Sequence, residues 1–150
     1  KLRYSLQDFS YSEVTVLRGK ESWRVTGAVK RENLFEILHG DPPMFAVFVR
    51  IFSLLERLLS GEEKNELLFE YLEEAVRFSL IKKQSKDRVQ NFEYILVLRI
   101  LSSLGYLGAS PDTMTFVESP YWSDELLQKI NLVAPRILGE INKSLKESQL

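Results

Sequence analysis

The sequence predicts a mainly helical protein in which a β-hairpin precedes a helical bundle. Residues 14–28, VTVLRGKESWRVTGA, alternate between apolar and polar positions on both sides of Gly19-Lys20, which is the pattern of two strands joined by a turn. From residue 41 onward, apolar segments recur with helical periodicity between glycines, prolines and polar stretches. We therefore expect a β part in residues 1–31 and an α-helical domain in residues 32–150.

Composition restricts the class of protein before any motif is considered. The 150 residues, 45% hydrophobic and 27% charged, are ordinary for a soluble globular protein with a core of its own. No apolar run approaches the ~20 residues of a membrane span, and no signal-peptide pattern is present, so we expect no membrane contact and a cytoplasmic location. The sequence starts at Lys1 inside an alternating apolar pattern, and we expect it to be a fragment.

Charge is distributed unevenly along the chain. Residues 1–31 hold seven basic residues against three acidic ones, a net charge of +4. The remaining residues hold 13 basic residues against 18 acidic ones, a net charge of −5. The basic character is therefore concentrated in the β part, which matters more for the choice of partner than the total of −1.

In the predicted hairpin, Gly19-Lys20 forms a two-residue turn of type II′, with glycine at the first central position. This turn fixes three cross-strand pairs: Arg18 with Glu21, Val16 with Trp23 and Val14 with Val25. One face then carries Val14, Val16, Trp23 and Val25, and we expect that face to be buried. Because an isolated hairpin is marginal in water, we expect residues 1–9 to supply a further strand or its lead-in.

The first predicted helix of the bundle has clear end signals. Asp41 precedes two prolines and can cap exposed N–H groups, while Ser60-Gly61 is a stop signal. Residues 44–59 are apolar on almost every side, so we expect this helix to run through the centre of the bundle. Residues 62–80 instead carry one apolar stripe opposite glutamates, which predicts an amphipathic surface helix.

The second half of the chain continues the helical pattern. Residues 81–87 form a polar connector, and the next segment is a nearly all-apolar helix that ends at Gly105. We expect Arg99, its one charge at mid-length, to be paired with a carboxylate or a backbone carbonyl. We interpret residues 105–120 as a packed loop, after which Ser123 caps one helix and Pro135 kinks or restarts the last.

Cationic and aromatic residues of the β part form a candidate surface for single-stranded nucleic acid. In such surfaces basic groups follow the phosphates and rings stack on bases. We expect Trp23 to be a core residue, because it lies on the face predicted to be buried. The candidate DNA-binding residues are Lys1, Arg3, Tyr4, Tyr11, Lys20, Arg24, Lys30 and Arg31.

The sequence does not argue for catalysis. The chain has no cysteine and one histidine, so disulfides, thiolate chemistry and a Cys/His zinc site are excluded. The acidic run Glu62–Glu74 has the spacing of a solvated helix face, and the sparse glycines of residues 105–108 do not make a phosphate-binding loop. We therefore expect no enzymatic activity, no cofactor and no metal.

Two stretches in this order resemble the RecO family of recombination mediators. The hairpin VTVLRGKESWRVTGA, introduced by KLRYSLQDFS, is similar to the later strands of that family's oligonucleotide-binding (OB-fold) barrel, where an RG…W…TGA pattern precedes the helices. Residues 92–108, FEYILVLRILSSLGYLG, resemble the family's LR-LL--LGY helix and its end. Many members carry four zinc-binding cysteines after this helix, whereas residues 107–122 contain none, as in the zinc-free members.

The resemblance implies a bacterial DNA repair protein without enzymatic turnover. Such proteins bind single-stranded DNA, anneal complementary strands, engage the acidic tail of single-strand binding protein, and act with RecR to load the recombinase RecA. Residues 1–31 would be the C-terminal part of an OB-fold barrel whose first strands lie upstream of Lys1. We therefore expect this chain to bind single-stranded DNA weakly, with an affinity no tighter than micromolar.

The tail of single-strand binding protein would require an apolar groove between helices with cations at its rim. The basic cluster of the helical part is the candidate for this partner site: Lys82, Lys83, Lys86 and Arg88. The alternative is that these residues form a solvated connector. A competing interpretation of the whole chain is a helical protein-interaction module with a packed β-hairpin and no role in nucleic-acid binding.

Overall fold

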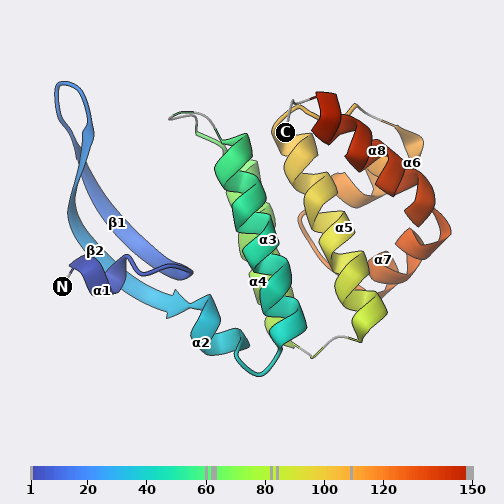
Figure 1. Cartoon of the computed structure of the whole chain (residues 1–150), viewed down its shortest axis with the longest axis horizontal. Coiled ribbons are helices and arrows are strands. Elements are labelled where there is room, and N and C mark those ends of the chain that lie inside the picture. Colours follow the sequence, from blue (N-terminus) through green and yellow to red (C-terminus); the bar gives the residue numbers. More distant parts are fainter. Residues whose placement is uncertain are drawn as a thin grey trace. The chain divides into compact units, whose positions relative to one another are not determined.

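The computed structural model describes residues 2–59, 61, 64–81, 83, 85–108 and 110–147. Its elements are α1 (Leu2–Ser5), β1 (Ser10–Arg18), β2 (Trp23–Asn33), α2 (Leu34–Leu38), α3 (Pro42–Leu58), α4 (Glu66–Ile81), α5 (Lys86–Ser103), α6 (Pro111–Val117), α7 (Asp124–Lys129), the 3-10 helix η1 (Ile130–Leu132) and α8 (Ala134–Glu147). The predicted class is confirmed, because a two-stranded hairpin precedes a series of helices (Figure 1).

The chain divides into two compact units, residues 1–45 and residues 46–150. The first unit contains α1, the hairpin, α2 and the first turn of α3, and the second contains the rest of α3 and the helices that follow. The division into a barrel part, residues 1–31, and a helical domain, residues 32–150, stays a prediction. None of the helices in the described ranges is long and apolar enough to cross a membrane.

Strands β1 and β2 are antiparallel, but their turn is longer than predicted. Arg18 pairs with Trp23 and Val16 pairs with Val25, and the N–H of Gly19 donates to the carbonyl of Ser22 over 2.9 Å. The predicted two-residue turn and its register are therefore wrong. Because side chains alternate with a period of two, this shift of two residues leaves every side chain near the turn on its predicted face.

The apolar face of the hairpin is exposed, which corrects the prediction that it is buried. Val14, Val16, Trp23 and Val25 share one face, and each is between 40% and 45% exposed. The expected third strand is also absent from the described part of residues 1–9. Leu2–Ser5 form α1 instead, with the N–H of Leu6 donating to the carbonyl of Leu2 over 3.0 Å.

Helix α5 is the centre of the second unit, where α4, α6, α7, η1 and α8 all pack against it (Figure 1). The prediction that the first helix of the bundle, now α3, occupies the centre is wrong, because one side of α3, with Val49, Ser53 and Glu56, is exposed. Phe92 of α5 is fully buried between Phe48 and Trp122, with ring centroids 6.0 Å and 4.4 Å away.

Arg99 of α5 is buried and bound to backbone carbonyls, as predicted. Its Nε and two terminal nitrogens donate to the carbonyl oxygens of Phe116, Pro120 and Tyr121 over 2.9, 2.9 and 2.8 Å. The guanidinium carbon also lies 4.4 Å from the ring centroid of Trp122. Burial lowers the pKa of Arg99 to about 10, so the side chain is charged at neutral pH. It fixes residues 116–121 onto the central helix.

The predicted end signals of the helices are confirmed at several positions. Asp41 Oδ1 accepts from the N–H of Met44, and Ser123 Oγ accepts from the N–H of Leu126. Pro135 lies in the first turn of α8, as expected for a helix that restarts. Residues 105–120 are only partly a loop, because Ser110 caps the short helix α6.

Candidate nucleic-acid interface

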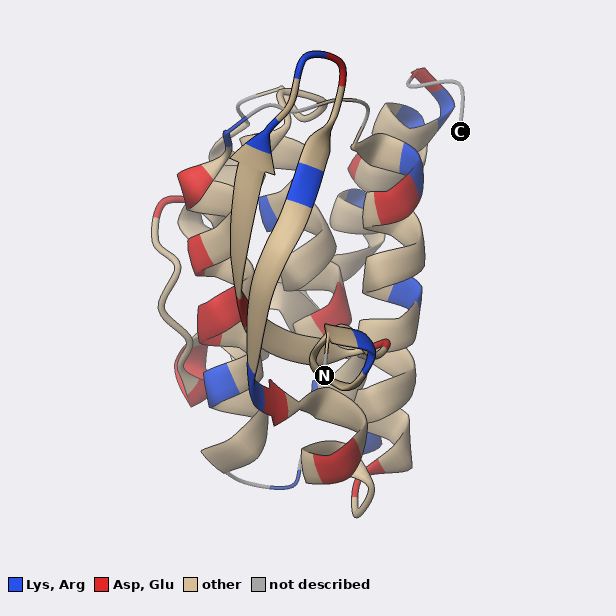
Figure 2. Ribbon diagram, turned by 90° about the vertical axis from the view of Figure 1, so that its left-hand side faces the viewer, with Lys and Arg blue, Asp and Glu red and all other residues tan. Residues whose placement is uncertain are grey.

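The basic residues of the hairpin gather near its turn. We call the group formed by Arg18, Lys20, Trp23 and Arg24 the turn-end cluster. Its three cations face one nearby carboxylate, that of Glu21 in the turn, which leaves a local charge of +2. Figure 2 shows these basic segments beside the turn and an uncharged stretch along the middle of the hairpin.

The three cations of the turn-end cluster are not neutralised within the described chain. None of Arg18, Lys20 and Arg24 forms an ion pair with a described residue. Arg18 and Arg24 lie on opposite faces of the hairpin, because Arg18 pairs with Trp23 and Arg24 with Leu17. The turn therefore presents positive charge in several directions.

Trp23 is 45% exposed and lies beside a cation. The guanidinium carbon of Arg18 is 5.6 Å from the centroid of its ring, because the observed register places the two residues opposite each other. The expectation that Trp23 is a core residue is wrong. Sequence reasoning also missed Arg18 as a candidate residue, since the assumed two-residue turn paired it with Glu21 rather than with the indole.

The cations at the other end of the hairpin are paired with carboxylates. Lys30 Nζ lies 2.8 Å from Glu36 and 4.6 Å from the centroid of the Tyr4 ring. The hydrogen bond to Glu36 raises the pKa of Lys30. Arg31 is 2.6 Å from Glu13. A phosphate at this end would have to compete with these carboxylates, which weakens the attraction.

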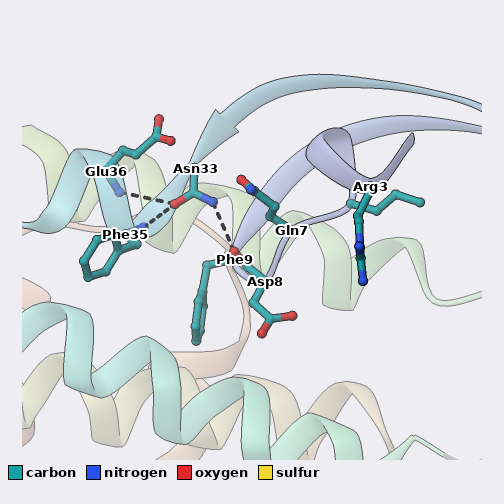
Figure 3. Close-up of a pocket in the computed structure, with 8 residues that line it drawn as sticks. Arg3, Gln7, Asp8, Phe9, Asn33, Phe35 and Glu36 are labelled. Atoms are coloured by element: carbon teal, nitrogen blue, oxygen red, sulfur yellow. Dashed lines mark hydrogen bonds between the residues drawn. The ribbon is translucent and has the colours of Figure 1, made fainter. Parts of the chain in front are cut away.

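A pocket of about 610 Å³ lies at this same end of the hairpin, lined by Arg3, Leu6, Gln7, Asp8, Phe9, Asn33, Phe35 and Glu36. Figure 3 shows Asn33 at its centre. The Asn33 amide donates to the carbonyl of Asp8 over 3.1 Å and accepts from the N–H groups of Phe35 and Glu36. The carboxylates of Asp8 and Glu36 line the pocket with Arg3, so it is not a purely cationic site.

Phe9 has a left-handed backbone, with φ of 61°, at the entrance to β1. This conformation costs an L-residue roughly 1–2 kcal/mol, so its surroundings must hold it in place. Its carbonyl accepts from the N–H of Leu34, and its ring packs edge-on against Phe45 at 5.1 Å. Together with the hydrogen bonds of Asn33, these contacts fix the base of the hairpin.

The eight predicted DNA-binding residues are therefore not brought into one surface. Lys20 and Arg24 are in the turn-end cluster, while Lys30 and Tyr4 contact each other at the opposite end with Arg31. The other three have separate positions: Arg3 lines the pocket, Tyr11 is 41% exposed on β1, and Lys1 lies outside the described residues.

The predicted partner site surrounds the start of α5. Lys82 lies outside the described residues, Lys83 lies just before α5, and Lys86 is its first residue. Arg88 forms an ion pair with Asp124 and keeps 23% of its side chain exposed. Lys83 and Lys86 are exposed, whereas Arg88 is half-buried.

Metal-binding geometry is not present in the ranges that the structure describes, where no group of three His, Cys, Asp or Glu side chains could hold an ion. His39 ends α2, and its Nδ1 lies 2.7 Å from the carbonyl oxygen of Glu36. That contact gives the histidine a local structural role.

The chain is similar to curated proteins named DNA repair protein RecO. The protein from Flavobacterium psychrophilum is 31% identical over 94 residues, which cover 63% of this chain and 36% of the relative. The protein from Christiangramia forsetii is 31% identical over 72 residues, which cover 48% of this chain and 28% of the relative. The matched region thus spans about a third of the relatives' length. No family model and no solved structure matches the chain.

Proposed function

Because the chain is similar to curated DNA repair proteins named RecO, we propose that it acts in DNA repair by binding single-stranded DNA through the turn-end cluster of its hairpin. The observation that carries this proposal is the group of three cations beside an exposed tryptophan. These cations have no ion-pair partner among the described residues, whereas those at the base of the hairpin are paired.

The proposed interaction is electrostatic and weak. Three phosphate contacts would release about three condensed counterions, so log K should fall with log salt at a slope of roughly −2 for a single strand. With so few contacts, we expect a dissociation constant in the range of about 10⁻⁴ to 10⁻⁶ M at physiological salt. This range agrees with an interface that carries part of the contacts of a larger DNA-binding protein.

The proposal is tested by fluorescence anisotropy of a labelled oligonucleotide against the wild type and two triple variants. One variant replaces Arg18, Lys20 and Arg24 with alanine, and it should lose most binding. The matched control makes the same change in charge on the helical unit: Arg57→Ala, Lys129→Ala and Lys146→Ala. Equal weakening by both variants would mean that only net charge matters, and the turn-end cluster would be rejected as a site.

We further propose that the helical unit engages the tail of single-strand binding protein and that the intact protein anneals strands and acts with RecR to load the recombinase. The support for this proposal is the family and the lysines at the start of α5. An acidic tail peptide should bind less tightly to the Lys82→Glu, Lys83→Glu double variant than to the wild type. Unchanged peptide affinity would remove these lysines from the proposed site.

The competing function is a helical interaction module without a nucleic-acid role. The same titrations separate the two functions, because a module of this kind would leave the anisotropy of the labelled DNA unchanged even at low salt. Peptide binding without DNA binding would assign the partner site to the helical unit and the DNA contacts to another part of the intact protein.

A further inference from the structure

We propose that Trp23 stacks on an unpaired nucleobase, so that the turn end of the hairpin selects single-stranded over duplex DNA. This inference rests on the proposed function and goes beyond it, because phosphate contacts alone carry no preference for exposed bases. It assigns to Trp23 the role of a specificity-determining residue, while the neighbouring cations supply attraction to the backbone.

The first argument is the exposure of the indole. A tryptophan is among the most costly side chains to leave in water, yet Trp23 is 45% exposed and lies next to the turn. Its indole carries only one described cation contact, that of Arg18, at 5.6 Å from the ring centroid. The exposed part of the indole is available to a flat, apolar ligand.

The second argument is the surroundings of the indole. Val16 and Val25 pair with each other in the next position on the same face, and they are 44% and 42% exposed. A base stacked on Trp23 would therefore cover apolar surface beyond the indole as well. Arg18 lies opposite Trp23 on the same face, and Lys20 lies in the turn three residues before Trp23, where they can reach the phosphates on either side of the base.

The third argument is the chemistry of the ligand. A nucleobase offers a polarizable flat face joined to an anionic phosphate, which matches an exposed ring with the Arg18 cation beside it. In a duplex both faces of each base are covered by their stacked neighbours, so only an unpaired base can stack on the indole. A second copy of this chain would also cover the valines, but it would bring the same cations to the interface and be repelled.

The test uses intrinsic fluorescence, because the chain has two tryptophans in different environments. Trp122 is stacked on Phe92 and Phe78 in the core, whereas Trp23 is exposed. An oligothymidylate should quench the wild-type emission and should leave the Trp23→Leu variant, which retains Trp122, nearly unchanged. An abasic oligonucleotide of the same length should bind through its phosphates without quenching, and a duplex should quench little.

Affinity provides the second readout. Loss of a base–aromatic stack should weaken oligothymidylate binding by about 5- to 150-fold in Trp23→Leu, with smaller loss in Trp23→Phe, which keeps a ring. Affinity for the abasic strand should be the same in all three proteins, and equal thermal melting curves would show that they are folded alike. An equal loss for both strands would overturn the stacking role.

The outcomes separate failure of this inference from failure of the proposed function. If the triple alanine variant of the cations loses DNA binding while Trp23→Leu keeps full affinity and quenching is absent, the cluster binds DNA but Trp23 does not stack. If neither variant changes binding, both proposals fail. Self-association that depends on Trp23, measured by sedimentation and unaffected by DNA, would assign the exposed face to an interface between copies instead.

Discussion

Replacing Arg99 with methionine should destabilise the helical unit far more than the same replacement of Arg50. Methionine has a similar length but no charge and no donors. The change leaves the carbonyls of Phe116, Pro120 and Tyr121 without their hydrogen-bond partner and removes the cation from the face of Trp122. Arg99 is 1% exposed, so no water replaces the guanidinium at its own position.

The magnitude follows from the number of bonds that are lost. An unsatisfied buried acceptor costs about 1–3 kcal/mol, and three of them set an upper range of about 3–9 kcal/mol. Partial hydration of residues 116–121 reduces this sum, because Tyr121 is 69% exposed. We expect a loss of about 3–5 kcal/mol, which is a large share of the roughly 5–15 kcal/mol that stabilises a domain.

Arg50 provides the matched control. It makes two hydrogen bonds to Glu93, of 2.6 and 2.7 Å, but its side chain is 56% exposed. An exposed pair of this kind contributes less than about 1 kcal/mol. Urea denaturation of both variants, followed by Trp122 fluorescence in a Trp23→Phe background, measures the difference. A loss below about 1 kcal/mol in Arg99→Met, equal to that in Arg50→Met, would refute the structural role of Arg99.

Three further predictions follow from single contacts. Asn33→Ala should lower the stability of the first unit by about 2–3 kcal/mol, because it removes a helix cap and two further hydrogen bonds. Amide hydrogen exchange around α2 should then accelerate at least tenfold, and unchanged exchange would contradict this prediction. Tyr71→Phe should cost about 1 kcal/mol in urea denaturation, since the hydroxyl donates to the carbonyl of Val117 over 2.6 Å. Burial lowers the folded-state pKa of Arg99 to about 10, below its ordinary value, so the stability linked to this group is present above that ordinary pKa and is lost as pH falls to about 10. The stability difference between wild type and Arg99→Met should therefore stay constant from pH 6 to 9, and a steady drift across that range would contradict this assignment.

The helical unit could be predicted well from the sequence because its signals are local. The spacing of apolar residues correctly predicted the buried stripe of α4, which includes Leu68 and Tyr71. Ser123 and Pro135 lie at helix starts, the positions that serine and proline favour. A charge in the middle of an apolar helix predicted that Arg99 is paired with a carboxylate or a backbone carbonyl, and its partners are carbonyls. The central position of α5 could not be predicted in the same way, because the choice between two apolar helices depends on tertiary packing.

The hairpin was harder to predict, because neither the length of its turn nor what packs on its apolar face is determined by the local sequence. The dipeptide Gly19-Lys20 suits a two-residue turn, but residues 19–22 form the observed one, and the register shifts by two. Burial of the valine face was inferred from alternation alone, which shows that a strand has an apolar side but not what covers it. Leu2 and Leu6 fit a strand and also the i,i+4 spacing of a helix, which α1 adopts.

The candidate site residues also differ in whether local sequence was enough to find them. Lys20 and Arg24 were identified from residue type and net charge, and they lie in the turn-end cluster. Arg18 was missed because its place beside Trp23 depends on the register. Lys30 and Arg31 were chosen on charge, but charge alone does not reveal that Glu36 and Glu13 pair with them in the folded chain.

The central claim is that the turn-end cluster contacts the phosphates of single-stranded DNA, and the salt dependence of binding tests it most directly. Affinity for a labelled oligothymidylate should be measured between 20 and 200 mM salt for the wild type and for Arg24→Ala. We expect a slope of roughly −2 in the wild type and a slope smaller in magnitude by about 0.7 in the variant, since one phosphate contact is lost. An identical slope in both proteins would contradict the account.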